Sequence, residues 1–575
     1  YIDPPYNTAA TQIMYKNEYM HSSWISLIND RILSSYPLML QEGVLCVAID
    51  DVEGSKLQNL LSDTMGIENL LGVVVVVHNP GGRHDDTYIA TSHEYCIYYG
   101  KDTLNTTTNL LPLEDKDIES FKHTGNNGSY RTREFRRSGN NSTREARPRM
   151  FYPILIKNGD LSLIEYSEYL RIFDKETNSF NEKFLNELRS KYTSLGFDFV
   201  LPVDPQGIIR VWRWTPDTLQ ARLADVFAVS KDNGYIIKVK DWLDNKAGLK
   251  PKSVWYKAKY TAALGTTLLK AIMGQGDLFT YPKSVSTVED SIRIASNESD
   301  SIIDYFAGSG TTGHAVINLN REDDGNRKYI LVEMGDYFDT VLKPRISKVV
   351  YSKDWKDGKP QSRDTGVSHC YKYLRLESYE DTLNNLVLTS EPEREKALAV
   401  SPVLQEDYLL HYMLEVESRG SLLNIDAFSD PTAYRLKVKK PGSDEYVEKA
   451  LDMIETFNYL IGLRLVHLAE PQTFTASFTR LKDPDLPQDQ ETKLVIDGDL
   501  KQAADGKWWI RKVEGWVPRN PYNPNDGLKE KVLIVWRKLT GDLEEDNLVL
   551  DTWFQKNRIN TLDWEFNTIY VNGSN

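Results

Sequence analysis

A glycine-rich turn between a short apolar strand and a helix constrains the fold of this chain most. Residues 301–304 are predicted to form a buried strand ending in an acid, residues 306–310 a tight turn, and a helix is expected from Thr311 onward. Glycine in such a turn lets the backbone approach a bound nucleotide closely. The order strand, turn, helix therefore predicts a doubly wound α/β sheet with a cofactor site at the end of the strand.

A second strand is expected at 328–332, and Glu333 follows it. An acid about twenty residues past such a turn is placed to bond ribose hydroxyls. We therefore expect Glu333 to be the ribose ligand, and Asp304 to contact another part of the cofactor or the turn itself. The turn lacks the third glycine of the dinucleotide fingerprint, which leaves a nicotinamide cofactor as the minor alternative.

The first six residues, Tyr1-Ile2-Asp3-Pro4-Pro5-Tyr6, suit the chemistry of an aromatic amine. Such an amine is a poor nucleophile because its lone pair is delocalised into the ring, so acceptors must hold both of its hydrogens. Asp3 can accept one hydrogen bond, and the Pro4 carbonyl, whose direction the rigid prolines fix, can accept the other. Tyr6 offers an aromatic face to an extruded base. Taken alone, these residues also fit a strand that ends in a Pro-Pro turn.

A local basic patch stands out in a chain whose net charge is −14. Glycine, asparagine and serine between its arginines favour a loop, and a basic loop can follow phosphates with a steep dependence on salt. A solvated surface loop is the alternative. The patch holds seven arginines within nineteen residues: Arg131, Arg133, Arg136, Arg137, Arg144, Arg147 and Arg149.

The rhythm of strands and helices divides the chain. Helices are expected at 23–40 and 56–65, and strands at 44–49, 70–77 and 95–99. The rhythm is lost from about 102 to 255, where residues 208–214 are predicted to form a strand and Thr215 to cap a helix. The part from about 375 is acidic and helix-rich at first, as at 391–395, and a strand–helix–strand unit is expected within 531–572. The predicted domains are 1–101, 102–255, 256–374 and 375–575.

Composition excludes several classes of protein. Three widely spaced cysteines argue against a disulfide framework and a zinc cluster, and the histidines lack metal-ligand spacing, so no metal is expected. The longest aliphatic run, Val73–Val77, is far too short to cross a bilayer, and no membrane association is expected. A reducing cytoplasm fits this cysteine usage. Because Tyr1 is not an initiator residue and the strand before Asp3 is almost absent, we expect a piece of a longer protein.

The chain resembles the modification (Mod) subunit of Type III restriction–modification systems, a β-class DNA amino-methyltransferase. The resemblance rests first on the two motifs, in the order Asp-Pro-Pro-Tyr and then glycine turn. The sequence departs from the family's pattern by starting inside the catalytic strand. Further runs that carry the resemblance are Gly43–Asp51, His93–Tyr95, Arg147–Ile154, Phe279–Lys283, Leu376–Asp381 and Glu455–Leu460.

The resemblance implies a Rossmann-like, circularly permuted S-adenosylmethionine-dependent methyltransferase domain, with an inserted recognition domain and an α+β C-terminal domain. Asp3 and Gly308 would face each other at the switch point of the sheet. The catalytic residues would be Asp3, Pro4, Pro5 and Tyr6. The cofactor, through its methionine moiety, ribose and base, would contact Asp304, Phe306, Ala307, Gly308, Ser309, Gly310, Thr311 and Glu333, together with the flanking residues Phe279, Pro282 and Lys283.

The implied activity is sequence-specific methyl transfer to the N6 amino group of adenine in duplex DNA after base flipping. Asp3, where related motifs have serine, favours adenine over cytosine. The C-terminal part would serve dimerisation and contact with a restriction (helicase–nuclease) subunit. Three alternatives stay open: a recognition subunit in which methylation is secondary, an N4-cytosine methyltransferase, and an RNA or protein amino-methyltransferase. The long insert with Trp212 and Trp214 favours duplex DNA over the last of these.

Overall fold

The structure is a computed structural model of the chain, and its residues form two compact units, 1–369 and 370–575, each described by itself. The acidic run 391–395 and two residues of the 376–381 signature, Tyr379 and Glu380, lie outside the described residues. The structure describes residues 1–7, 20–82, 86–231, 234–244, 246–378, 381, 385, 428–440, 443, 445–482, 492–521, 523, 527–561 and 565–573.

The core of the first unit is a sheet in two hydrogen-bonded groups. In one, β14 (Ser301–Asp304) runs parallel to β15 (Lys328–Leu331). In the other, β3 is antiparallel to both β1 and β2, and β13 is parallel to β2. The order of this group is β1 (Val44–Ile49), β3 (His93–Gly100), β2 (Leu70–Val77) and β13 (Val254–Trp255).

The first residues of the chain join these two groups. Ile2 donates to the Cys46 carbonyl and accepts from the Ala48 amide, both at 2.9 Å, in a parallel bridge with β1. The Tyr1 amino group donates to the Ile303 carbonyl of β14 at 3.3 Å. The segment that carries Asp3 therefore lies between β14 and β1, and the two motif segments are neighbours, as the resemblance implied. Circular permutation itself stays a prediction.

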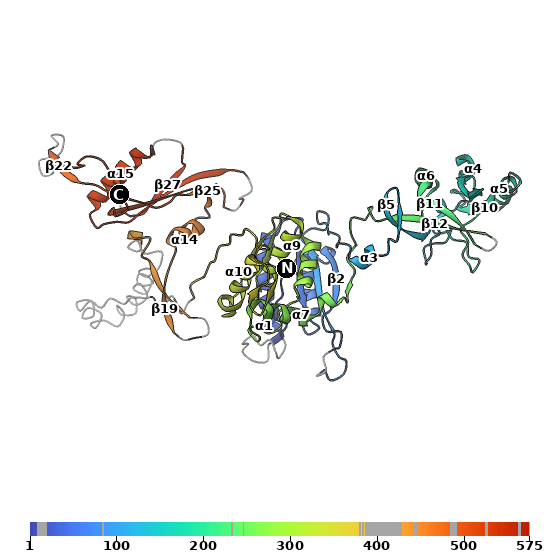
Figure 1. Ribbon diagram of the computed structural model, residues 1–575, viewed down its shortest axis with the longest axis horizontal. Helices are drawn as coiled ribbons and strands as arrows, with labels where there is room; N and C mark the ends of the chain where they lie inside the picture. Colours follow the sequence, from blue (N-terminus) through green and yellow to red (C-terminus); the bar gives the residue numbers. More distant parts are fainter. Residues whose placement is uncertain are drawn as a thin grey trace. The chain divides into compact units, whose positions relative to one another are not determined.

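Helices cover both faces of this sheet (Figure 1). On one face, α1 (Met20–Ser35) and α2 (Gly54–Met65) pack against Val47 and Ile49 of β1. On the other, α8 (Val285–Ala295) and α9 (Thr311–Asp323) pack against Cys46 and Ala48 of the same strand. Successive side chains of β1 therefore point to opposite covered faces of the sheet. A strand that is buried on both faces is almost wholly apolar, as this one is. The doubly wound α/β prediction is confirmed for this part of the chain.

The local predictions for this core hold with one correction. The predicted strands 44–49 and 70–77 are β1 and β2, and Gly66 follows the end of α2. The helix predicted to run to Leu40 ends at Ser35, followed by a short 3₁₀ turn at Tyr36–Leu38. Pro37 explains the early end, because proline disfavours the helical conformation of the residue before it.

Residues between β3 and β13 form two further sheets, and side chains of both sheets pack in one core. A four-stranded antiparallel sheet has the order β11 (Val226–Lys231), β12 (Gly234–Trp242), β5 (Gly128–Glu134) and β4 (His123–Gly125). A three-stranded sheet has the order β10 (Asp198–Val200), β6 (Ile154–Lys157) and β7 (Asp160–Leu163). The helices of this region are α3 (Asp115–Ile118), α4 (Tyr166–Leu170), α5 (Glu182–Ser194) and α6 (Pro216–Ala221).

Two predictions for this region need correction. Residues 208–214 do not form a regular strand: Ile209, Arg210 and Trp212 make only isolated bridges to three different partners. Arg131 and Arg133 lie on β5 and not in a loop. The predicted helix after Thr215 is present as α6, with Pro216 in its first turn.

The second unit is built on a sheet with the order β24 (Lys501–Gln502), β21 (Gln472–Thr475), β25 (Trp508–Pro518), β26 (Lys529–Arg537) and β27 (Thr568–Val571). β26 and β27 are parallel, and α15 (Leu543–Lys556) connects them, which confirms the predicted strand–helix–strand unit. Trp553 of α15 packs with Trp508 and Leu533 in the core. The fourfold domain division stays a prediction.

Candidate active site

Hydrogen bonds to α1 and to Glu53 hold the Asp-Pro-Pro-Tyr segment in place, and the Pro4 carbonyl is left as an available acceptor. Trp24 donates from Nε1 to the Pro5 carbonyl at 2.7 Å, and the Asn7 amide donates to Glu53 Oε1 at 2.6 Å. Among the described residues, no donor reaches the Pro4 carbonyl. The Asp3 side chain is 24% exposed. Asp3 and the Pro4 carbonyl thus offer the two acceptors that an amine requires.

The charge of Asp3 is balanced between opposing neighbours. Burial raises the pKa of Asp3, Lys283 lowers it, and Glu94 and Asp304 raise it again, with the outcome that it lies at about 6. Asp304 belongs to the glycine-turn motif, so the two predicted motifs are close enough to interact electrostatically. The sheet brings together groups that lie about three hundred residues apart in the sequence.

The glycine turn is held by the two strands that flank it. Asp304 accepts from the Phe306 amide at 3.0 Å and from Thr312 Oγ1 at 2.5 Å, and the Ala307 amide donates to the Val332 carbonyl at 3.2 Å. Gly310 has a φ of 83°, and a Cβ there would lie 3.1 Å from Leu342 Cγ. A larger residue would be strained in this conformation and crowded as well. The turn therefore requires glycine at this position.

Glu333 closes the opposite side of the turn. Its carboxylate accepts from the Gly308 amide at 2.8 Å and from the Met334 and Gly335 amides at 2.8 and 2.9 Å. The Phe279 ring lies against Gly308, 3.2 Å from where a Cβ would be, and meets Tyr337 edge-on at 4.9 Å. An acid and an aromatic ring beside a glycine turn suit a ribose and a flat base.

Lys283 contacts the side chains of the Asp-Pro-Pro-Tyr segment. Its ammonium donates to Glu94 Oε2 at 2.5 Å and to the Tyr6 hydroxyl, and lies 3.4 Å from Asp3 Oδ1. Tyr6 in turn donates to Glu94 Oε2 at 3.0 Å. Burial opposes the charge of Lys283, yet Asp3 and Glu94 outweigh it and raise the pKa of the ammonium above its ordinary value. Its predicted cofactor contact stays a prediction, and its contacts in the structure are with Glu94 and with Asp3 and Tyr6, two of the predicted catalytic residues.

A buried arginine donates hydrogen bonds to the glycine turn. Arg345 of α10 (Lys343–Tyr351) is fully buried, and its guanidinium donates to the Ser309 carbonyl, Ser309 Oγ, Thr311 Oγ1 and His314 Nδ1 at 2.8–3.3 Å. It forms no ion pair with a carboxylate among the described residues. Burial and then Arg345 hold the pKa of His314 well below its ordinary range, so His314 is a neutral acceptor.

Four of the seven predicted phosphate contacts already have acidic partners. Arg131 and Arg133 each lie 3.0 Å from Asp241, Arg136 lies 2.6 Å from Glu134, and Arg144 lies 2.6 Å from Glu182. Arg137, Arg147 and Arg149 form no ion pair among the described residues. The DNA role of all seven stays a prediction.

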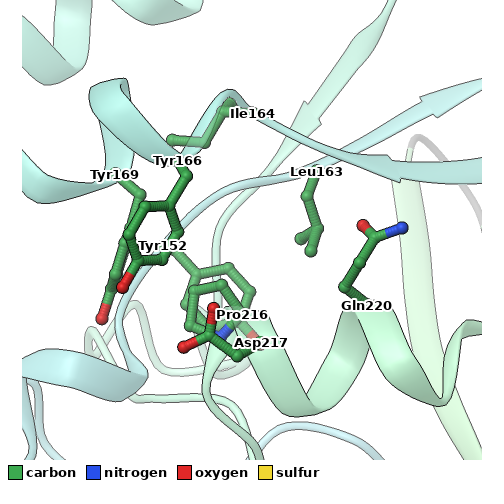
Figure 2. Close-up of a pocket in the computed structure, with 8 residues that line it drawn as sticks. All are labelled: Tyr152, Leu163, Ile164, Tyr166, Tyr169, Pro216, Asp217 and Gln220. Atoms are coloured by element: carbon green, nitrogen blue, oxygen red, sulfur yellow. The ribbon is translucent and has the colours of Figure 1, made fainter.

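A cavity of about 330 Å³ lies in the region between β3 and β13. Figure 2 shows its aromatic wall, in which Tyr166 and Tyr169 belong to α4 and the rings lie 5.7 Å apart. None of the predicted site residues lines it, so it is separate from the candidate active site. Its lining residues are Tyr152, Leu163, Ile164, Tyr166, Tyr169, Pro216, Asp217 and Gln220.

No described helix combines the length and apolar character needed to cross a membrane. Within the same residues, no three histidine, cysteine or acidic side chains are grouped as a metal site.

A family model described as DNA methylase matches residues 1–343, more than half of the chain. The chain belongs to the DNA methylase family. A Type II methyltransferase, M.KpnI of Klebsiella pneumoniae, is 30% identical over 345 residues, covering 58% of this methylase and 74% of that protein.

Two further relatives are named as Type III subunits. The EcoPI Mod subunit of Escherichia phage P1 is 27% identical over 367 residues, 58% of the methylase and 53% of that protein. The probable HindVI Mod subunit of Haemophilus influenzae is 23% identical over 490 residues, 80% of the methylase and 60% of that protein. The methylase therefore spans little more than half the length of these two subunits.

Sequence reasoning missed two residues of the site. Glu94 entered only as part of a signature, although an acid at the start of an apolar strand was a signal. Arg345 gave none, because only the fold reveals that it lies under the turn.

Proposed function

We propose that this methylase transfers a methyl group from S-adenosylmethionine to an exocyclic amine of DNA, and that the amine is N6 of adenine. The observation that carries the proposal is the pairing of Asp3 with the glycine turn across adjacent strands of one sheet. Family membership supports the reaction class. The aspartate of the motif supports adenine.

The glycine turn fits S-adenosylmethionine. The Glu333 carboxylate beside the Gly308 amide is the proposed acceptor for ribose hydroxyls, and the Phe279 ring beside the turn is the proposed face for the base. When bound, the cofactor supplies a methyl group on a sulfonium sulfur, and the neutral thioether that remains is a good leaving group. The chain itself then needs neither a nucleophile nor a metal for the transfer.

The catalytic residues act by positioning and charge. The Asp3 carboxylate and the Pro4 carbonyl accept hydrogen bonds from the two N–H groups of the amine, which localises its lone pair for attack on the methyl carbon. Asp3 then takes the proton that the methylated amine must lose, and the thioether released when the carbon–sulfur bond breaks is the leaving group. The Tyr6 ring stacks on the flipped base and offsets part of the cost of extrusion. Pro4 and Pro5 fix the backbone, so the acceptors are in place before the base arrives.

We also propose the cellular role that the names of the relatives suggest. The methylase would be the modification subunit of a Type III restriction–modification system, with duplex DNA as substrate. The region 102–255 would recognise the target sequence. The second unit would serve dimerisation and contact with a helicase–nuclease partner. Similarity to two named Mod subunits supports this role.

The decisive experiment supplies tritiated S-adenosylmethionine and mixed-sequence duplex DNA to the protein. The DNA is then digested to nucleosides, and the labelled nucleoside is identified. We expect label in N6-methyladenine. Label in N4-methylcytosine would keep the reaction and change the base. Cofactor binding without labelled DNA would reject the proposal and favour a recognition subunit or a substrate other than DNA.

A further inference from the structure

The Glu94 carboxylate is unusually placed for a strand residue. It lies on β3 opposite Val76, and its side chain is only 6% exposed. A buried carboxylate is costly unless it is paired and hydrogen-bonded. Lys283 and Tyr6 satisfy that requirement, and neither group is adjacent to Glu94 in sequence. Burial works against its charge, yet Lys283 and these hydrogen bonds hold the pKa of Glu94 below its ordinary value.

The Lys283 ammonium is shared unequally between two carboxylates. Its distance to Glu94 Oε2 is 2.5 Å, a charge-assisted hydrogen bond, whereas 3.4 Å to Asp3 Oδ1 is longer than ordinary hydrogen bonds. Lysine is a flexible point charge that moves to the acceptor within reach. Without Glu94, the ammonium would close on Asp3 and occupy the oxygen that the amine needs.

We propose that Glu94 is a positioning residue that draws the Lys283 ammonium away from Asp3, so that Asp3 keeps a neighbouring positive charge and a free acceptor oxygen. The same carboxylate holds the Tyr6 hydroxyl and with it the orientation of the ring. The inference rests on the proposed methylation of an amine. It assigns Lys283 to the catalytic half of the site and to its electrostatics.

The groups around Asp3 give this arrangement a pH signature. They are Tyr1 and Tyr6 on its own segment, Glu94 on β3, Lys283 ahead of α8, and Asp304 at the end of β14. His78, which follows β2, faces Glu94. Glu94 raises the pKa of Asp3 and Lys283 lowers it. Removing the one charge or the other must therefore move the titration of Asp3 in opposite directions.

The test compares Glu94→Gln, Lys283→Met and the double variant with the unsubstituted parent protein. Glu94→Gln should lower kcat about tenfold or more, while KM for cofactor and for DNA changes less than about twofold. The acid limb of kcat should move to lower pH in Glu94→Gln and to higher pH in Lys283→Met. The double variant should match Lys283→Met in kcat, since Glu94 acts on that rate through the lysine, and its acid limb should lie between those of the two single variants, since both charges are removed.

Glu322→Gln is the control. Glu322 also pairs with a cation, because its carboxylate accepts from Arg293 Nη2 at 2.8 Å, but it lies near the far end of α9 and outside the proposed recognition region. Its kcat and acid limb should equal those of the parent. Limbs that move in the same direction, effects that multiply in the double variant, or an equal effect in the control would overturn the proposal.

A second readout needs no methyl acceptor. Carbon-13 NMR of protein labelled at the aspartate carboxyls gives the titration of Asp3 directly, with Asp3→Asn as the assignment control. Opposite shifts in the two single variants support the inference even if DNA is not the substrate, and unchanged titration rejects it. If circular dichroism shows that Glu94→Gln is unfolded, the Asp3 pKa in Lys283→Met decides: a rise supports the inference, and an unchanged pKa rejects it.

Discussion

Asp3 illustrates a conflict between stability and function within one residue. Its pKa is about 6 in the folded chain and near 3.8 in an exposed aspartate, first because it is buried. Between these values the folded state holds the proton more tightly than the unfolded state. The contribution of Asp3 to stability is therefore lost as pH rises towards 6, and above that pH its charge costs about 2–3 kcal/mol.

Asp3→Asn should consequently remove activity and stabilise the cofactor-free protein. We expect a Tm a few degrees higher than that of the parent at pH 8, with a gap that shrinks as pH falls from 7 to 5. Differential scanning calorimetry of both proteins across this pH range measures it. A lower Tm for the variant at pH 8 would show that the carboxylate stabilises the fold and that its environment is described wrongly.

At the scale of elements, α7 (Ala262–Met273) packs closely against the backbone of Pro282 and Lys283 and so fixes the position of the Lys283 backbone. A Cβ on Gly265 would lie 2.2 Å from the Pro282 carbonyl and 2.6 Å from that of Lys283. Both obstacles are backbone atoms, which cannot move aside cheaply. Gly265→Ala should displace Lys283 and lower kcat about tenfold or more. Gly276→Ala, at an uncrowded position of ordinary conformation, should not. Equal rates in the two variants would contradict this account.

The dependence of the glycine turn on α10 gives another prediction. Arg345→Met removes four hydrogen bonds to the turn and to His314, so cofactor binding should weaken about tenfold, or about 1.4 kcal/mol. Isothermal titration calorimetry measures the change. Arg293→Met serves as the control, because it breaks only the ion pair between Arg293 of α8 and Glu322 of α9. Unchanged cofactor affinity in Arg345→Met would show that the turn holds its shape unaided.

Elements with a local signal were the ones that sequence could predict. The strand, turn and helix at 301–323 follow from an apolar run, glycines and helical periodicity that adjoin one another in the chain. Residues 208–214 misled because their apolar residues suggest a strand, while their backbone partners come from three separate segments. Contacts such as Glu94 with Lys283 join positions 189 residues apart. No local pattern encodes such a distance, so the charge network of the site required the fold.

At the scale of the whole molecule, a net charge of −14 means that DNA binding must rely on a local surface. The ion pairs divide the predicted arginines into two groups. Arg149 is exposed and without an acidic partner among the described residues, whereas Arg144 is paired with Glu145 and Glu182. An arginine already neutralised by a carboxylate releases fewer counterions from DNA.

Arg149→Gln should therefore lower the salt dependence of DNA binding by about one in the slope of log affinity against log salt. Arg144→Gln should leave that slope close to the parent value. Fluorescence anisotropy with labelled duplex DNA between low and moderate salt gives both slopes. A larger loss of slope in Arg144→Gln would mean that its ion pairs open on DNA binding.

The central claim is that Asp3 and the glycine turn form one site for amine methylation. Methyl transfer from labelled S-adenosylmethionine to duplex DNA, measured side by side for the parent and Asp3→Ala, tests it most directly. We predict N6-methyladenine from the parent and at least a hundredfold loss in the variant, with cofactor and DNA affinity retained. Methylation that persists in Asp3→Ala would contradict the claim and place the catalytic acceptor elsewhere.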